Sequence, residues 1–90
     1  MTLDDEIKRG HEADRLLENP LLAEAFDTIA KELETAWRNS PAKDEAGREK
    51  LWVMRKLLDR VEAHIKTIAQ TGQMARKTVS MKAGLSVWPR

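Results

Sequence analysis

Six apolar residues in the second half of the chain recur at alternating spacings of three and four, and this pattern constrains the fold more than any other feature. They are Leu51, Met54, Leu58, Val61, Ile65 and Ile68. The spacing places all six side chains on one face of an α-helix, in the heptad arrangement by which helices pack together. Asp44 is a favourable start and Gly72 a favourable stop, so we expect a helix over about 44–71.

A second helical stripe precedes this one. It consists of Leu22, Phe26, Ile29, Leu33 and Ala36. Asn19 is a good N-cap before Pro20, and Pro41 disfavours helix at the residue before it, which predicts a helix over about 20–39. Because the connection between the two helices is short, we expect them to form an antiparallel hairpin.

The ends of the chain complete the predicted fold. Thr2 and Asp5 resemble a capping box at the start of an N-terminal helix over about 3–18. We therefore predict an all-α protein, with a helical bundle over residues 1–77 and an extended C-terminal arm over residues 78–90.

The hairpin leaves apolar residues without a partner. Trp52, Val53 and Leu57 lie outside the heptad stripe, so one neighbouring helix does not cover them. A chain of 90 residues without cysteine has no disulfides to compensate for a small core. We expect the N-terminal helix to dock on the hairpin, copies of the chain to associate as a homo-oligomer, or both.

Two tryptophans are predicted to meet at the hairpin tip. Trp37 lies near the end of the first long helix, and Trp52 lies in the early part of the second. They could plug that end of the seam, which we favour, or form an exposed aromatic anchor for a partner, because tryptophan is enriched at binding hot spots.

The last thirteen residues alternate like a half-buried strand. An all-helical body offers such a strand no ladder, so we expect it to dock on a neighbouring subunit. A disordered tail and a continuation of the preceding helix are the alternatives. The predicted partner-binding residues are Val79, Met81, Leu85, Val87 and Trp88.

No pattern in the sequence supports catalysis or a cofactor. His11 and His64 lack neighbouring ligands for a metal, and the four glycines are isolated, so no phosphate loop is present. Without cysteine, a nucleophilic serine would need a nearby histidine, and none is predicted close to one. We expect no enzyme, and neither an export signal nor a membrane span.

Nucleic-acid binding is a weaker alternative. The net charge is +1, but after Glu62 the chain contains bases and no acid. The possible phosphate contacts are Arg76, Lys77 and Lys82.

Three stretches resemble small helical proteins of tailed phages and prophages. They are NPLLAEAF, AWRNSPAKDEAGREKLW and KLLDRVEAHIKTIAQTGQMA, within residues 16–77. The resemblance implies a setting in virion structure, head–tail connection or DNA packaging, in the virion or the host cytoplasm. It carries over no site residue, and it does not reach the arm.

The expected function is therefore that of a non-catalytic assembly protein, such as a virion structural or head–tail connector component whose arm docks on another subunit. The alternatives are a nucleic-acid-associated packaging or regulatory factor that uses the basic C-terminal region, and a small regulator that binds a host protein.

Overall fold

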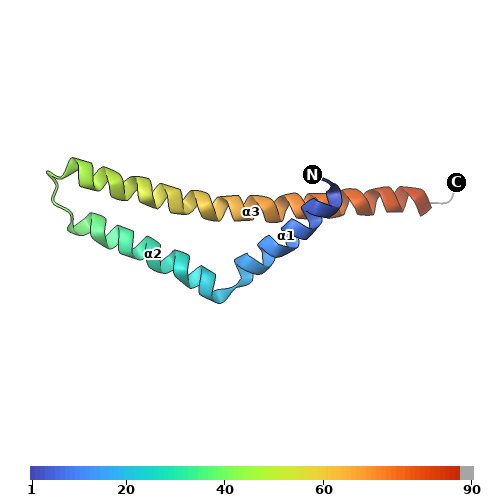
Figure 1. Cartoon of the computed structure of the whole chain (residues 1–90), viewed down its shortest axis with the longest axis horizontal. Helices are drawn as coiled ribbons and strands as arrows, with labels where there is room; N and C mark the ends of the chain where they lie inside the picture. Colours follow the sequence, from blue (N-terminus) through green and yellow to red (C-terminus); the bar gives the residue numbers. More distant parts are fainter. Residues whose placement is uncertain (88–90) are drawn as a thin grey trace. The chain divides into compact units, whose positions relative to one another are not determined.

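The computed structural model describes residues 1–87, with the side chains of residues 1–82. Three helices account for nearly all of this part: α1 (Leu3–Glu18), α2 (Pro20–Asn39) and α3 (Glu45–Val87) (Figure 1). The described residues contain no strand, which confirms the predicted all-α class. The chain divides into two compact units. We call residues 1–18 and 65 onward unit 1, and residues 19–64 unit 2; α3 contributes to both.

The predicted starts of α1 and α2 are confirmed by their caps. Thr2 Oγ1 accepts a hydrogen bond from the Asp5 amide at 3.1 Å, and the Asp5 carboxylate accepts one from the Thr2 amide at 3.4 Å. At α2, Asn19 Oδ1 accepts hydrogen bonds from the amides of Leu21 and Leu22, at 2.9 and 3.3 Å. Both arrangements satisfy amides that have no partner within the helix.

The turn between α2 and α3 is held by one arginine. Arg48 Nη1 donates to the carbonyl of Trp37 at 3.1 Å, to the carbonyl of Ser40 at 3.3 Å and to Ser40 Oγ at 2.9 Å. At the start of α3, Asp44 Oδ1 accepts a hydrogen bond from the Gly47 amide at 3.0 Å. Arg48 thus satisfies carbonyls at the end of α2 from the first turns of α3.

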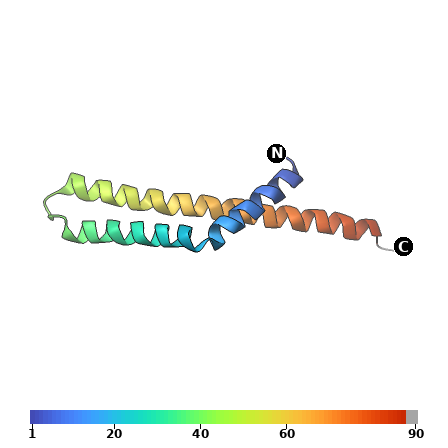
Figure 2. The same cartoon turned by 60° about the horizontal axis from the view of Figure 1, so that its bottom comes forward.

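In unit 2, α2 and the first part of α3 lie side by side with opposite chain directions (Figures 1 and 2). Their facing side chains are only half-buried, among them Leu22, Phe26 and Leu33 on α2 and Leu51 and Leu58 on α3. No residue of α2 is buried. Unit 2 therefore has facing apolar stripes but no closed core.

Unit 1 is built on a close helix crossing. A Cβ placed on Gly10 of α1 would lie 2.6 Å from the Cα of Gly72 on α3, so only glycine fits at this point. Small side chains surround the crossing, and the buried residues of the described chain are Gly10, Ala13, Ala69, Gly72 and Ala75. Beside it, Arg76 lies 3.9 Å from the carboxylate of Asp14. Figure 2 shows α1 passing across α3.

The predicted end of the third helix is wrong. We expected it to stop near residue 71, but α3 continues through Gly72 to Val87. Gly72 lies inside the helix, where its missing side chain allows the close contact with Gly10. In the next turns Thr78 Oγ1 donates to the Met74 carbonyl at 3.0 Å, which is a bond made within a helix.

The predicted extended arm is accordingly wrong over residues 78–87, which are helical. Alternation at every second residue is weak evidence for a strand when the residues are also compatible with a helix. In the helix, Val79 and Met81 do not share a face, because residues two apart lie about 200° apart around the axis. Leu85 and Val87 belong to α3, and nothing is described of their side chains; Trp88 lies outside the described residues.

Candidate interaction surfaces

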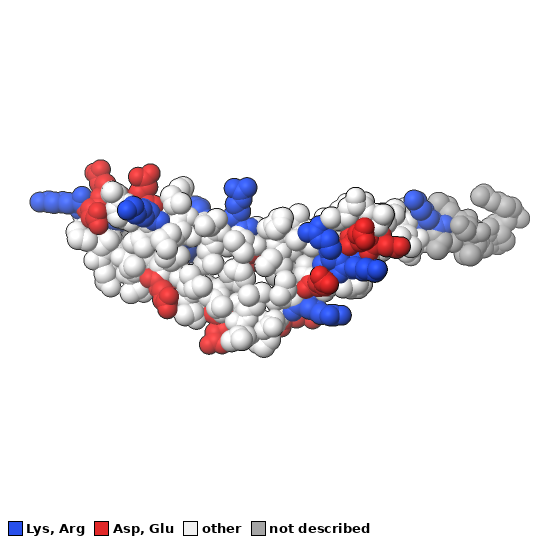
Figure 3. Space-filling view, in the orientation of Figure 1, with Lys and Arg blue, Asp and Glu red and all other residues white. Residues whose placement is uncertain are grey.

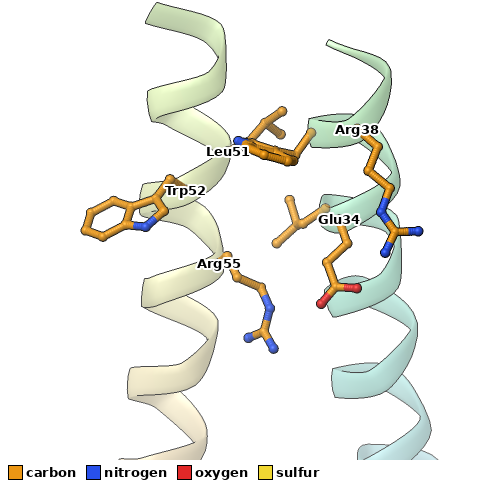
Figure 4. A pocket seen from close by; sticks show the side chains of 7 residues that line it. Glu34, Arg38, Leu51, Trp52 and Arg55 are labelled. Carbon is orange, nitrogen blue, oxygen red and sulfur yellow. The ribbon is translucent and has the colours of Figure 1, made fainter. Parts of the chain in front are cut away.

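A groove beside the α2–α3 turn is the first candidate surface. It has a volume of about 290 Å³. We call it the tip groove; its lining residues are Leu33, Glu34, Trp37, Arg38, Leu51, Trp52 and Arg55. Figure 4 shows Glu34 and Arg38 on α2 and Leu51, Trp52 and Arg55 on α3, with the Trp52 ring directed away from α2.

Both tryptophans of the groove are exposed. The guanidinium of Arg48 lies 3.9 Å from the ring centroid of Trp37, and Lys56 Nζ lies 5.6 Å from that of Trp52. The exposed fractions are 44% for Trp37 and 58% for Trp52. A plug of the helix seam would be buried, so the favoured interpretation of these residues is wrong for the single chain, and the aromatic-anchor alternative agrees better with their exposure.

The charges of the groove are mixed. The lining contains two bases, Arg38 and Arg55, and one acid, Glu34. Arg55 forms an ion pair with Asp59, one turn further along α3. On the remaining face of α2, Lys31 pairs with Asp27 at 2.9 Å, and the hydrogen bond to Asp27 raises the pKa of Lys31. A partner protein that binds the groove would therefore contact the apolar rings of the two tryptophans and, around them, charged side chains of both signs, one of which is already in an ion pair.

A second exposed surface lies on the opposite flank of unit 2. We call it the apolar face, and its residues are Leu21, Ile29, Val53, Met54, Leu57 and Val61. Their exposed fractions range from 44% for Ile29 to 71% for Leu21. Three members of the predicted seam, Ile29, Met54 and Val61, belong to this face rather than to a closed interface. Figure 3 shows that uncharged atoms cover a broad area of one face of unit 2, with charged side chains mostly at its margins.

The position of the apolar face follows from the groove. Successive residues of an α-helix are rotated by about 100° around its axis. On each helix, the residue directly after a half-buried one in the sequence therefore lies on one flank of the unit, and the residue directly before it lies on the other. Glu34 follows Leu33 and Trp52 follows Leu51, and both line the tip groove. The preceding residues therefore share the other side of the unit, and these include Leu21 before Leu22 and Leu57 before Leu58.

The residues predicted to bind partners or phosphate at the C-terminal end lie on α3 in unit 1. Val79 and Met81 are 42% and 68% exposed. Arg76 stands beside Asp14, while Lys77 and Lys82 are exposed. Phosphate binding by these three bases stays a prediction.

Among the described residues, no group of three or more His, Asp or Glu side chains is arranged to hold a metal ion. In the same part of the chain, no helix has both the length and the apolar character needed to cross a membrane. Comparison with family models, curated proteins and solved structures gives no match for the chain. The phage setting therefore stays a prediction that rests on the sequence resemblance alone.

The role of Arg48 could not be read from the sequence. Arg48 and Trp37 are far apart in the sequence, and their contact depends on the geometry of the turn between them, which no sequence pattern predicts. The nearest signal was the prediction that Trp37 and Trp52 meet at the hairpin tip, which brings Trp37 close to the early part of the next helix.

Proposed function

We propose that this chain is a non-catalytic assembly protein that binds a partner protein through the tip groove. The observation that carries the proposal is the pair of exposed indoles, Trp37 and Trp52, on one groove at the end of unit 2. Large exposed aromatic surface is costly to leave in water, and it commonly marks a binding site.

The chemistry of the groove supports a protein partner. Tryptophan and arginine dominate the binding energy of many interfaces, and here Trp52 and Arg55 lie on α3 with Trp37 and Arg38 on α2. Arg48 holds the Trp37 ring from one side and fixes the turn. Such an anchor needs little reordering on binding, which lowers the entropic cost of association.

In this proposal α2 and the first part of α3 act as an antiparallel hairpin that presents the groove at its turn. The hairpin serves as a spacer, and its tip contacts another subunit of a larger assembly. The phage resemblance adds the setting, namely a virion structural or head–tail connector component.

The nucleic-acid alternative receives less support. Asp14 lies 3.9 Å from Arg76 and offsets part of its charge. Phosphate binding by the predicted bases would show as a DNA affinity that falls steeply with salt concentration. An affinity of this kind that is lost on neutralising Arg76, Lys77 and Lys82 would favour this alternative over the assembly protein.

The proposal is tested by replacing Trp52 with alanine. The tagged chain is produced in the cells that naturally make it, and its sedimentation in a gradient of cell extract is followed. We expect the unmodified chain to sediment with a large complex and the Trp52→Ala chain to remain largely free, because loss of a hot-spot indole costs about 2 kcal/mol or more.

The matched control is Gln73→Ala, which removes an exposed side chain of α3 far along the helix from the groove. It should sediment like the unmodified chain. A complex that retains the Trp52→Ala chain in full, or an unmodified chain that sediments alone, would contradict the proposed function.

A further inference from the structure

From the apolar face and the charges along its two edges, we infer that unit 2 pairs face to face with unit 2 of a second copy, with α2 of each copy over α3 of the other. This inference deepens the proposed assembly function by naming one partner as a second copy of the chain, and it uses the flank opposite the tip groove. The occupant is therefore separate from the partner proposed for the groove.

The apolar face has the composition of one half of a four-helix packing. It takes Leu21 and Ile29 from α2 and Val53, Leu57 and Val61 from α3, all of them more than two-fifths exposed. Two antiparallel helices with one uncovered apolar side become a closed bundle when an identical pair covers that side. The symmetry is that of a dimer, in which both copies use the same surface.

The two sides of the face carry opposite charges, and we call these sides its edges. The α2 edge carries Glu24 and Glu32, and the α3 edge carries Lys50 and Arg60. Glu32 and Lys50 directly precede the half-buried Leu33 and Leu51, so they lie among the apolar residues, whereas Glu24 and Arg60 lie further around their helices. All four side chains are exposed, and within the described residues none of them makes an ion pair. Glu49 is the one acid near the α3 edge, and Lys31 near the α2 edge is paired with Asp27.

These charges select one of two symmetric arrangements. If α2 lay over α2 of the second copy, acids would face acids along one edge and bases would face bases along the other, which is unfavourable. If α2 lies over α3 of the second copy, each acidic edge meets a basic edge. The second arrangement also brings the two α2–α3 turns to the same end of the dimer.

The levels of the charged residues agree with this arrangement. The groove lining places Leu33 and Glu34 beside Trp52 and Arg55, which sets the height at which α2 and α3 pass each other. From that level, Glu24 lies within about one turn of Arg60, and Glu32 within about two turns of Lys50. The two-fold symmetry gives the same heights across the dimer, so long side chains can meet at both edges.

The test reverses the charges of one edge at a time. Sedimentation equilibrium gives the dimer dissociation constant of the unmodified chain and of three variants. The first is Glu24→Lys with Glu32→Lys, the second is Lys50→Glu with Arg60→Glu, and the third carries all four changes. We expect each double variant to weaken the dimer at least about tenfold, because attraction becomes repulsion at both edges, and the fourfold variant to restore it.

Two further measurements fix the geometry. Glu34→Lys, a charge reversal on the groove side of α2, should leave the dissociation constant unchanged. Because the natural chain has no cysteine, Lys43→Cys supplies a single thiol in the turn, and a short bifunctional reagent should join two copies through it. Circular dichroism shows that each variant keeps its helices.

Three results would overturn the inference: an unmodified chain that stays a monomer of 10.3 kDa at all concentrations, double variants that dimerise as well as the unmodified chain, or a dimer that does not cross-link at position 43. None of them touches the proposed tip groove, which the Trp52→Ala experiment tests separately. Failure of the dimer and failure of the partner-binding function are thus distinguishable.

Discussion

At the scale of single residues, Arg48 links two helices and an aromatic ring. Its guanidinium serves acceptors on Trp37 and Ser40 while it stacks on the indole at 3.9 Å. The planar fork of arginine suits both contacts at once, whereas lysine offers a point charge on a flexible stem. Arg48 thus holds the turn between α2 and α3 together with the loop residues, of which Ser40 donates hydrogen bonds to the same Trp37 carbonyl.

We predict that Arg48→Ala lowers the free energy of unfolding by about 1–3 kcal/mol, because hydrogen bonds to carbonyls and a cation–π contact are lost together. Arg48→Lys should recover only part of the loss. Urea unfolding followed by circular dichroism measures both values. Equal stability of all three chains would show that the turn does not rely on Arg48.

Gly10 and Gly72 determine how closely α1 and α3 approach, because they allow the two helices to contact each other through their backbones. Alanine at position 72 would favour the isolated helix by about 1 kcal/mol. Its Cβ would also lie 2.6 Å from the Cα of Gly10, so the two helices would have to separate. The higher helix propensity favours the folded chain, whereas the clash disfavours it. The clash is with backbone atoms of Gly10, which cannot rotate away as a flexible side chain could.

We therefore predict that Gly72→Ala releases α1 although it raises helix propensity. Hydrogen exchange of the α1 amides should accelerate by tenfold or more, while the amides of α2 stay as protected as before. Gln73→Ala, one residue further on, serves as the control because its side chain is exposed. Slower exchange in α1 of the Gly72→Ala chain would refute the close crossing.

At the scale of elements, the sequence predicted the helix starts well and the last helix end poorly. Asn19 with Pro20 and Thr2 with Asp5 are local signals, and the caps they predict are present. The presence of a glycine inside α3 has a tertiary reason, since Gly72 has a packing role that requires Gly10 from a distant segment. We favoured the strand-like alternation after residue 78 over a continuation of the preceding helix, which the same residues also permit and which the structure shows to Val87.

The helical state of residues 78–87 is open to a direct test. Val79→Pro removes an amide from the helix and clashes with the preceding turn, at a cost of about 3 kcal/mol. We predict a clear fall in the helical circular dichroism signal and the loss of helical Cα chemical shifts around position 79. An extended arm would accept the proline without either change.

The candidate surfaces were predicted in part. Three apolar residues outside the seam predicted uncovered apolar surface on α3. These are Trp52, Val53 and Leu57, and the structure shows all three exposed. The sequence did not predict that Ile29, Met54 and Val61 would join them, because the rotation of each helix about its own axis is set by packing and not by spacing. It also favoured a buried role for Trp37, which is half-exposed instead.

At the scale of the whole molecule, the buried residues and the large apolar residues are in different places. Among residues 1–82, whose side chains are described, burial is confined to small residues at the crossing in unit 1, whereas the large apolar side chains of unit 2 are half-buried or exposed. Burying a large apolar side chain stabilises a protein by about 1.5–3 kcal/mol, so surface of this kind favours association. Two separate flanks of unit 2 carry it, the tip groove and the apolar face, and each is assigned its own occupant.

The central claim is that this chain completes its apolar packing by association, and the mass of the purified protein tests it most directly. Sedimentation equilibrium over a wide concentration range should give twice the chain mass of 10.3 kDa at high concentration, and Leu57→Asp should return the protein to the single-chain mass with its helices intact. An unmodified chain that keeps a mass of 10.3 kDa throughout, with full helicity and cooperative unfolding, would contradict the account.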